Sequence, residues 1–422
     1  MQTGLIQNAH NDLVTDAAYD FYGLRLATSG LDQRLKVWQL DEQNGTWTAT
    51  HDWKAHDAPV SKLSWAHPEF GAIIASASFD RTVKIWEETL AEPEQQQVNG
   101  APSTTASSSR WVERAVISDA KGSVRAVEFA PRHFGLKLAT ISSDNYLRIY
   151  ECLEAPSLST WQLSEEIDIN GLAFSPASGS HPHTMAMATP TQTLSVLDGP
   201  NASVVASALQ QHQNQPQGRP GAGNREADGG WCISWCKDRY WGEIIAVGAG
   251  VNGLIKIIQI SPSRRPILLF TLDSSPPTEA TGSTGSNSAE PDGAQPASVS
   301  SVAWAPSCGR SYHLVATGSR DGHVRIWRLK PPSYDEERMS EEDSRWTGSV
   351  VGDFDHHKSA VGRVEWNVTG TILSSAGNDG RIRLWKATTG NVWRAAGHIS
   401  VEQAEELQKE GGTEMDDVVG AE

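Results

Sequence analysis

The sequence predicts an all-β protein, a β-propeller of six blades, and two observations carry that prediction. A tight turn ending in Asp, followed six residues later by Trp, recurs in four places along the chain. Around each copy, short stretches of alternating apolar residues are bounded by Gly, Asp, Asn or Pro, which is typical of β-strands. Repetition at a period of several tens of residues indicates a repeat architecture, and four strands per repeat indicate the blades of a propeller. The four clear pairs are Asp32 and Trp38, Asp80 and Trp86, Asp321 and Trp327, and Asp379 and Trp385.

The predicted blades follow one another along residues 1–397. In the third blade Tyr150 takes the place of the Trp, and in the fourth Ile258 does so. The six blades are expected at about 8–53, 55–117, 119–163, 164–272 with a large insertion at 170–230, 298–354 and 356–397.

The segment 164–198 leaves one structural question open. It carries an apolar-aromatic stretch that ends in Ser-Pro, as a blade would, but it lacks His, Asp and Trp in register. It is either a degenerate seventh blade or an insertion, and we favour the insertion. Segments 91–109, 199–230 and 273–297 are of low complexity, which predicts loops. An acidic flexible tail is expected at 398–422.

Composition narrows the functional classes. The 422 residues carry a net charge of -16, which argues against direct nucleic-acid binding because that requires a basic face. No apolar run is long enough for a transmembrane helix, and the first residues do not resemble a secretory signal. The four cysteines lack a CxxC pair, so we expect a reducing compartment and no disulfide framework.

The His and Asp residues of the repeats are expected to stabilise the fold rather than to catalyse. An active site occurs once, whereas this combination recurs in most of the blades. A buried Asp needs hydrogen-bond donors, which a preceding His and backbone N–H groups can supply. The Trp N–H is expected to join through a Ser or Thr, such as Ser78 or Ser319. The predicted network consists of His10, Asp32, Trp38, His56, Ser78, Asp80, Trp86, Asp144, Ser319, Asp321, Trp327, His357, Asp379 and Trp385.

No residue set indicates catalysis, a cofactor or a metal. His181 and His183, and the pair His356 and His357, lack further ligands at metal-binding spacing. Cys232 and Cys236 lie on one face of a predicted strand and should pack as small apolar groups. Glycine-rich phosphate-binding motifs and a nucleophile elbow are missing from the sequence, so we expect no enzyme.

Several longer strings resemble one family of propellers. These strings include WAHPEFGAIIASASFDRTVKIWEE, LRIYE followed by STWQLSEEI, and WNVTGTILSSAGNDGRIRLWKA. They resemble the Sec-thirteen-homologue nucleoporins, WD40 propellers of the Y-shaped scaffold complex of the nuclear pore. By this resemblance, STWQLSEEI together with 231–258 forms the fourth blade.

The resemblance implies an open six-bladed propeller that a helical-solenoid nucleoporin completes by inserting a blade in trans. It further implies other Y-complex nucleoporins as partners, a place at the nuclear envelope, and transport of mRNA and protein as the process served. A vacuolar or lysosomal coat complex that regulates TOR signalling is a second implied location. The exposed edges of the first and last blades would bind the partner. Two alternatives remain: a vesicle-coat propeller subunit, and a WD40 adaptor that recognises a peptide.

Overall fold

The computed structural model describes residues 6–90, 109–173, 228–261, 264–274, 297–332 and 345–400. All of them belong to one compact unit, Met1–Phe174 with Glu226–Glu422, and the remaining unit, Ser175–Arg225, lies outside the described residues. Within the described ranges, no helix is both long and apolar enough to span a membrane.

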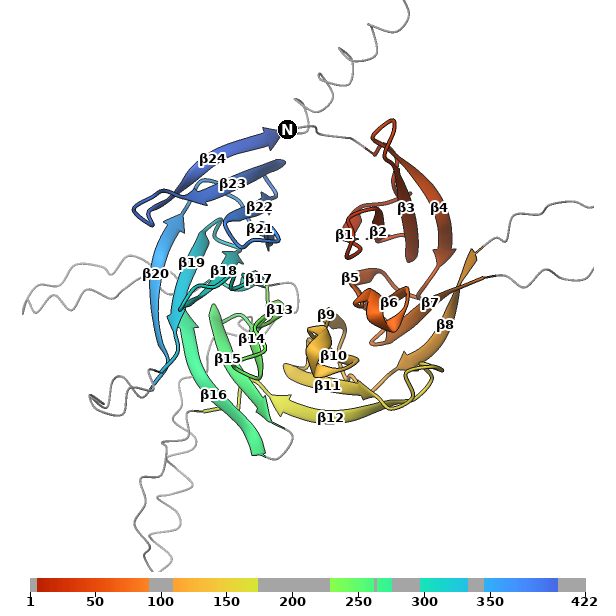
Figure 1. The fold of residues 1–422 in the computed structure, drawn as a ribbon, viewed down its shortest axis with the longest axis horizontal. Helices are drawn as coiled ribbons and strands as arrows, with labels where there is room; N and C mark the ends of the chain where they lie inside the picture. The colour runs from red at the N-terminus through yellow and green to blue at the C-terminus, as the bar shows by residue number, and fades with distance from the viewer. Residues whose placement is uncertain are drawn as a thin grey trace, which may run out of the picture. The chain divides into compact units, whose positions relative to one another are not determined.

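The described chain forms six antiparallel sheets of four strands, each a blade of a propeller (Figure 1). The first three blades run in chain order. Blade one contains β1 (Val14–Tyr19), β2 (Arg25–Gly30), β3 (Arg34–Asp41) and β4 (Thr46–Lys54); blade two contains β5 (Val60–Trp65), β6 (Ile73–Ser78), β7 (Val83–Leu90) and β8 (Ser109–Ile117); blade three contains β9 (Val124–Phe129), β10 (Lys137–Ser142), β11 (Tyr146–Cys152) and β12 (Trp161–Asp168).

The last three blades repeat this plan, and two short 3₁₀ helices, η1 (Pro68–Phe70) and η2 (Arg132–Phe134), connect strands of blades two and three. Blade four contains β13 (Gly230–Trp235), β14 (Glu243–Gly250), β15 (Leu254–Ser261) and β16 (Arg264–Asp273); blade five contains β17 (Val299–Trp304), β18 (His313–Ser319), β19 (Val324–Lys330) and β20 (Thr347–Phe354); blade six contains β21 (Val361–Trp366), β22 (Ile372–Gly377), β23 (Arg381–Ala387) and β24 (Trp393–Ser400).

The predicted boundary between blades three and four is wrong. Trp161–Asp168 is one continuous strand, β12, which pairs with β11 along its whole length and completes blade three. Ile167 packs into the core between blades three and four, so this strand cannot end at 163. Blade four instead starts at Gly230, and STWQLSEEI contributes nothing to it. Residues 174–198, the rest of the questioned segment, lie outside the described residues.

The end of the last blade also differs from the prediction. Strand β24 continues to Ser400, three residues beyond the predicted end at 397, and Ile399 pairs with Ile382 of β23. The remaining tail, 401–422, lies outside the described residues, as do nearly all of the three low-complexity segments.

The core lies between the blades. Strand interiors are fully buried where a blade has neighbours on both sides, as in β6, β10 and β18. Their small and β-branched residues suit this position because each sheet packs both of its faces against another sheet. The innermost strand of each blade therefore lies beside the innermost strand of the next, around a common axis (Figure 1).

Candidate functional site

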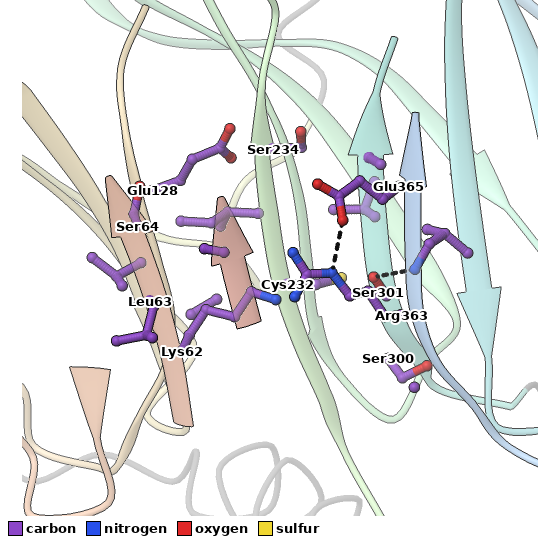
Figure 2. Close-up of a pocket in the computed structure, with 18 of the residues that line it drawn as sticks. Lys62, Leu63, Ser64, Glu128, Cys232, Ser234, Ser300, Ser301, Arg363 and Glu365 are labelled. Carbon is purple, nitrogen blue, oxygen red and sulfur yellow. Dashed lines mark hydrogen bonds and ion pairs between the residues drawn. The ribbon is translucent and has the colours of Figure 1, made fainter. Parts of the chain in front are cut away.

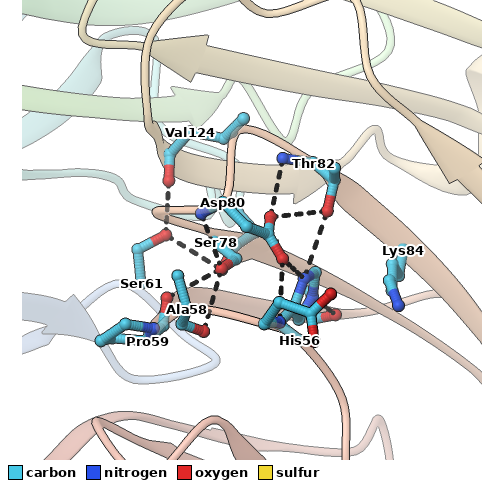
Figure 3. A network of polar contacts seen from close by, with 12 residues as sticks. His56, Ala58, Pro59, Ser61, Ser78, Asp80, Thr82, Lys84 and Val124 are labelled. Carbon is cyan, nitrogen blue, oxygen red and sulfur yellow. Dashed lines mark hydrogen bonds and ion pairs between the residues drawn. The ribbon is translucent and has the colours of Figure 1, made fainter.

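A polar network joins the turn Asp to the Trp in blades one, two and six. In blade two, Nδ1 of His56 lies 2.9 Å from Asp80 (Figure 3). Nε2 of the same ring lies 2.8 Å from Oγ of Ser76. The Trp86 N–H donates to the same Oγ at 2.9 Å. Equivalent contacts join His10, Thr28, Asp32 and Trp38 in blade one and His357, Ser375, Asp379 and Trp385 in blade six.

The Trp N–H does bond to a Ser or Thr, as predicted, but the two residues named as examples, Ser78 and Ser319, are wrong. Trp86 bonds to Ser76, and Trp327 donates to Oγ1 of Thr317 at 3.0 Å. Ser78 instead donates to the carbonyls of Ala58 and Pro59, and Ser319 donates to the Asp321 carboxylate. The true acceptor lies two residues earlier, because the antiparallel register places it beside the Trp, with Ile74 opposite Trp86.

Arginines take part in the network of blades three and five, which the sequence reasoning missed. Arg148 donates to Asp144 at 2.9 Å and to Ser142 at 2.9 Å, and its side chain is almost fully buried. Arg325 lies 3.7 Å from Asp321 in the same arrangement. An Arg four residues after the turn Asp was the available signal, since the long side chain can reach back to the carboxylate.

The turn aspartates act as fixed acceptors. Burial alone would raise the pKa of Asp80, but hydrogen bonds from His56 and Thr82 outweigh it and hold that pKa well below the ordinary value. The pKa of Asp32 and that of Asp379 are lowered for the same reason. A carboxylate that stays ionised at neutral pH cannot serve as a general acid, so the geometry suits a structural device.

Candidate metal ligands do not assemble in the described part of the chain. No group of three or more His, Cys, Asp or Glu is placed there to hold an ion. His357 belongs to the polar network and His356 packs against Trp385, while His181 and His183 lie outside the described residues. Cys232 and Cys236 are buried in the core between blades four and five, as predicted, and burial raises the pKa of each thiol to about 12.

Five hydrophobic clusters join the blades, and each spans two consecutive blades. They lie between blades one and two, two and three, three and four, four and five, and five and six. Among the described residues, no cluster joins blade six to blade one. We call this sixth place the seam. It is the candidate functional site, because in the described part of the chain two blade faces there lack the neighbour that every other face has.

The seam face of blade six is identified by strand alternation. Leu373 and Ser375 face blade five, so Ser374 and Ala376 on the same strand face the seam. Ile382 of β23 pairs with Ala376 and is 44% exposed, whereas Val83 and Val324, at the same place three residues before the Trp of blades two and five, are buried. The face is small, carries the apolar Ala376 and Ile382, and is left open by the described residues.

The seam face of blade one carries an aromatic residue in each of two strands. Trp86, Trp327 and Trp385 each pack into the cluster shared with the preceding blade, whereas Trp38 belongs to none of the clusters. Tyr19 closes β1 and is 59% exposed, although Trp235 at the same place in β13 is fully buried. Tyr19 therefore marks the side of blade one on which the described residues provide no preceding blade, although Trp38 itself is only 7% exposed.

A buried ion cluster ties the seam together at the axis. Asp16 on β1 accepts from Lys62 Nζ at 3.0 Å and from Arg363 of β21, and Arg363 also donates to the Ala17 carbonyl at 2.7 Å. Burial alone would raise the pKa of Asp16, but the two cations and the Leu63 N–H hold it below its ordinary value. Lys62 and Arg363 line an axial cavity of about 700 Å³ (Figure 2). The sequence signal was a charged residue at the third place of the inner strands β1, β5 and β21.

Comparisons with known proteins agree with this architecture. A WD domain, G-beta repeat family model matches residues 3–39, 47–87, 291–328 and 348–386. In fold, the chain is similar to one in a crystal structure of the mitotic checkpoint complex, with a TM-score of 0.50 and 14% identity over 89% of this chain and 74% of that one. At such low identity the likeness shows the fold alone.

Closer relatives are nucleoporins. Nucleoporin SEH1 of Saccharomyces cerevisiae is 31% identical over 94% of this chain and 99% of its own length. Nucleoporin SEH1 of Homo sapiens is 33% identical over 92% of this chain and 85% of its own length. Nucleoporin seh1 of Schizosaccharomyces pombe is 31% identical over 95% and 97% of the two chains. With six WD40 blades and relatives that match along almost its whole length, the chain belongs to the SEH1 nucleoporin family.

Proposed function

We propose that this chain is a non-catalytic scaffold subunit of the nuclear pore complex, and that it accepts a blade from a helical-solenoid nucleoporin at the seam. The observation that supports this most directly is the set of hydrophobic clusters. Every pair of consecutive blades shares one, and the seam between blades six and one shares none among the described residues.

The seam has the properties of an acceptor for added strands. Exposed sheet surface with apolar residues favours the addition of strands from another chain. Ile382 on one side and Tyr19 on the other would be covered by an inserted blade. Burial of such side chains supplies free energy roughly in proportion to the apolar area removed from water. The partner's strands thus complete a seventh blade.

The cellular place of this function follows from the family. The relatives are named nucleoporins, which supports a role in the Y-shaped complex at the nuclear envelope and, through it, in transport of mRNA and protein. The chain would reach the envelope through its protein partners. A second role in a vacuolar coat complex that regulates TOR signalling would use the same seam with a different donor.

Co-expression tests the proposal. The chain is produced with the solenoid nucleoporin of its own organism, and the mixture is separated by size-exclusion chromatography. A parallel sample contains a partner that lacks its N-terminal strands. We expect one complex with the full partner and separate peaks with the truncated one. Elution of this chain alone in both samples would overturn the proposal, as would a complex that does not need the strands. Exclusive co-purification with vesicle-coat or ubiquitin-ligase subunits would do the same.

A further inference from the structure

The six innermost strands can be compared position by position. Each contains six residues, and in every blade except the fourth an irregularity in pairing falls at the same place, between the first and third residues. We number each inner strand from one to six. Position three is Asp16, Lys62, Ala126, Cys232, Ser301 and Arg363, and position five is Ala18, Ser64, Glu128, Ser234, Ala303 and Glu365.

Each of the five closed junctions uses one side-chain oxygen in the same way. An acceptor on one inner strand takes a backbone N–H from the inner strand of the next blade. At position three, Asp16 accepts from Leu63 at 2.9 Å and Ser301 from Val364 at 3.1 Å; at position five, Ser64 accepts from Phe129 at 3.0 Å, Glu128 from Trp235 at 3.2 Å and Ser234 from Trp304 at 3.0 Å.

The reason lies in the antiparallel ladder. Every second N–H of an inner strand points away from its partner within the blade, toward the preceding blade. A buried N–H without an acceptor costs free energy comparable to a lost hydrogen bond. Positions four and six carry these outward N–H groups, so each junction needs an acceptor at position three or five.

At the seam, blade six carries one side chain that can act as such an acceptor. This side chain takes part in none of the five closed junctions. Position three is Arg363, which can only donate and is engaged with Asp16 and the Ala17 carbonyl. Position five is Glu365, the counterpart of Glu128, and its side chain is 60% exposed. One Glu365 oxygen lies 3.1 Å from Arg363 Nε, which leaves acceptor capacity on the carboxylate (Figure 2).

On the other side, blade one offers N–H groups in the matching positions. Asp20 donates its N–H to the Arg25 carbonyl of the ladder at 2.9 Å, as Ala66 does to Ile73 in blade two. Because the direction of the N–H groups alternates along a strand, those of Ala17 and Tyr19, at positions four and six, point toward the seam. The seam therefore presents an acceptor on one face and donors on the other.

We propose that Glu365 accepts a backbone N–H from the innermost strand of the inserted blade. By analogy with the five closed junctions, the innermost strand of the inserted blade carries Ser, Asp or Glu at its third or fifth position. That side chain accepts the N–H of Ala17 or Tyr19, respectively. This inference rests on the proposed insertion of a blade and specifies its chemistry. An inserted strand with apolar side chains at both its third and its fifth position would provide no acceptor for these N–H groups and does not fit the seam.

The test measures affinity for the full solenoid nucleoporin of the same organism. Dissociation constants are determined for the unmodified chain, Glu365→Ala and Glu365→Gln. The matched control is Glu113→Ala on β8, which also removes an exposed carboxylate from an ion pair, here with Lys84 at 2.9 Å, but lies away from the seam. Because hydrogen bonds to charged groups are among the stronger ones, Glu365→Ala should weaken binding about tenfold. Glu365→Gln keeps an acceptor oxygen and should weaken it about threefold or less.

Amide hydrogen exchange gives a second, independent readout. On complex formation, exchange at Ala17 or Tyr19 should slow markedly, and replacement of the partner's polar residue at position three or five by Ala should restore it. Equal affinity of the Glu365→Ala variant and the Glu113→Ala control, or unchanged exchange at both amides in a complex that needs the partner's strands, overturns this inference and leaves the blade insertion standing. If the unmodified chain does not bind the partner, both proposals fall.

Discussion

At the scale of single residues, the fold depends on polar groups that are buried with their partners. The Trp, the Ser or Thr beside it, the His and the turn Asp form one continuous set of hydrogen bonds, so each member orients the next. Such networks specify a unique packing because an unpaired member would be costly in a low-dielectric interior.

The contribution of this network to stability can be measured at Trp86. Its side chain is only 5% exposed, and its ring centroid lies 5.6 Å from that of Trp53. Its N–H donates to Ser76. Trp86→Ala should lower the free energy of unfolding by about 3–5 kcal/mol, as large-to-small core changes do. Trp86→Phe retains most of the ring and should lose less than half as much. Denaturant unfolding checks both, and an unchanged stability of Trp86→Ala would contradict a core role.

The burial of His313 predicts that the stability of the fold depends on pH. It lies buried among Trp241, Trp304 and Trp346, and this burial lowers its pKa from 6.5 to about 4. The unfolded chain therefore takes up a proton at a pH where the folded chain does not, and stability is lost as the pH falls from 6.5 toward 4. Between pH 7 and pH 5 the loss should be about 2 kcal/mol.

A substitution isolates the contribution of His313. His313→Phe keeps an aromatic ring in the cluster and removes the titration, so its unfolding free energy should change less between pH 7 and pH 5. The carboxylates with lowered pKa, such as Asp16 and Asp80, contribute mainly below about pH 4 and so stay outside this window. Equal losses in both proteins, measured by urea unfolding at the two pH values, would refute the assignment.

At the scale of strands, the sequence predicted the repeats well where the turn Asp and Trp are present. It failed at β12, where neither marks the strand, and so placed the boundary between blades three and four inside it. It also misplaced the Trp acceptor, because a two-residue difference along β6 is decided by pairing register rather than by spacing from the Asp. Arg148 stands four residues after the turn Asp, but it was missed because that spacing alone does not show that the side chain is buried.

Gly230 shows how closely two inner strands approach. The other inner strands begin with Val, but a Cβ added at Gly230 would lie 1.9 Å from the carbonyl oxygen of Val299 in the next blade. Gly230→Ala must therefore separate blades four and five and should cost about 2–3 kcal/mol, in the range of overpacked cores. Gly397→Ala on β24 meets open space and serves as the control, with little change expected. Thermal unfolding of both variants tests this, and equal melting temperatures would contradict the close approach.

At the scale of the whole molecule, the ring is a series of similar junctions with one exception. Five junctions combine a hydrophobic cluster with a side-chain acceptor for the next inner strand. The seam instead has the ion cluster of Asp16, Lys62 and Arg363 at the axis. Asp16 is buried, and its ion pair with Arg363 joins blade one to blade six at the axis, so removing Arg363 would leave a buried carboxylate with one cation fewer. The sequence could not reveal this arrangement, since it depends on residues about 350 positions apart.

The last prediction separates binding at the seam from stability of the ring. Ile382 is 44% exposed on the seam face of blade six, so Ile382→Asp should change the free energy of unfolding by less than about 1 kcal/mol. In the complex, however, the same carboxylate would be buried against an apolar blade without a partner, which is strongly unfavourable. We expect the variant to melt like the unmodified chain and to lose the solenoid nucleoporin in size-exclusion chromatography. Val324→Asp, at the same place in blade five but fully buried, should unfold the protein instead. Retention of the partner by a folded Ile382→Asp variant would show that the inserted blade does not cover this face.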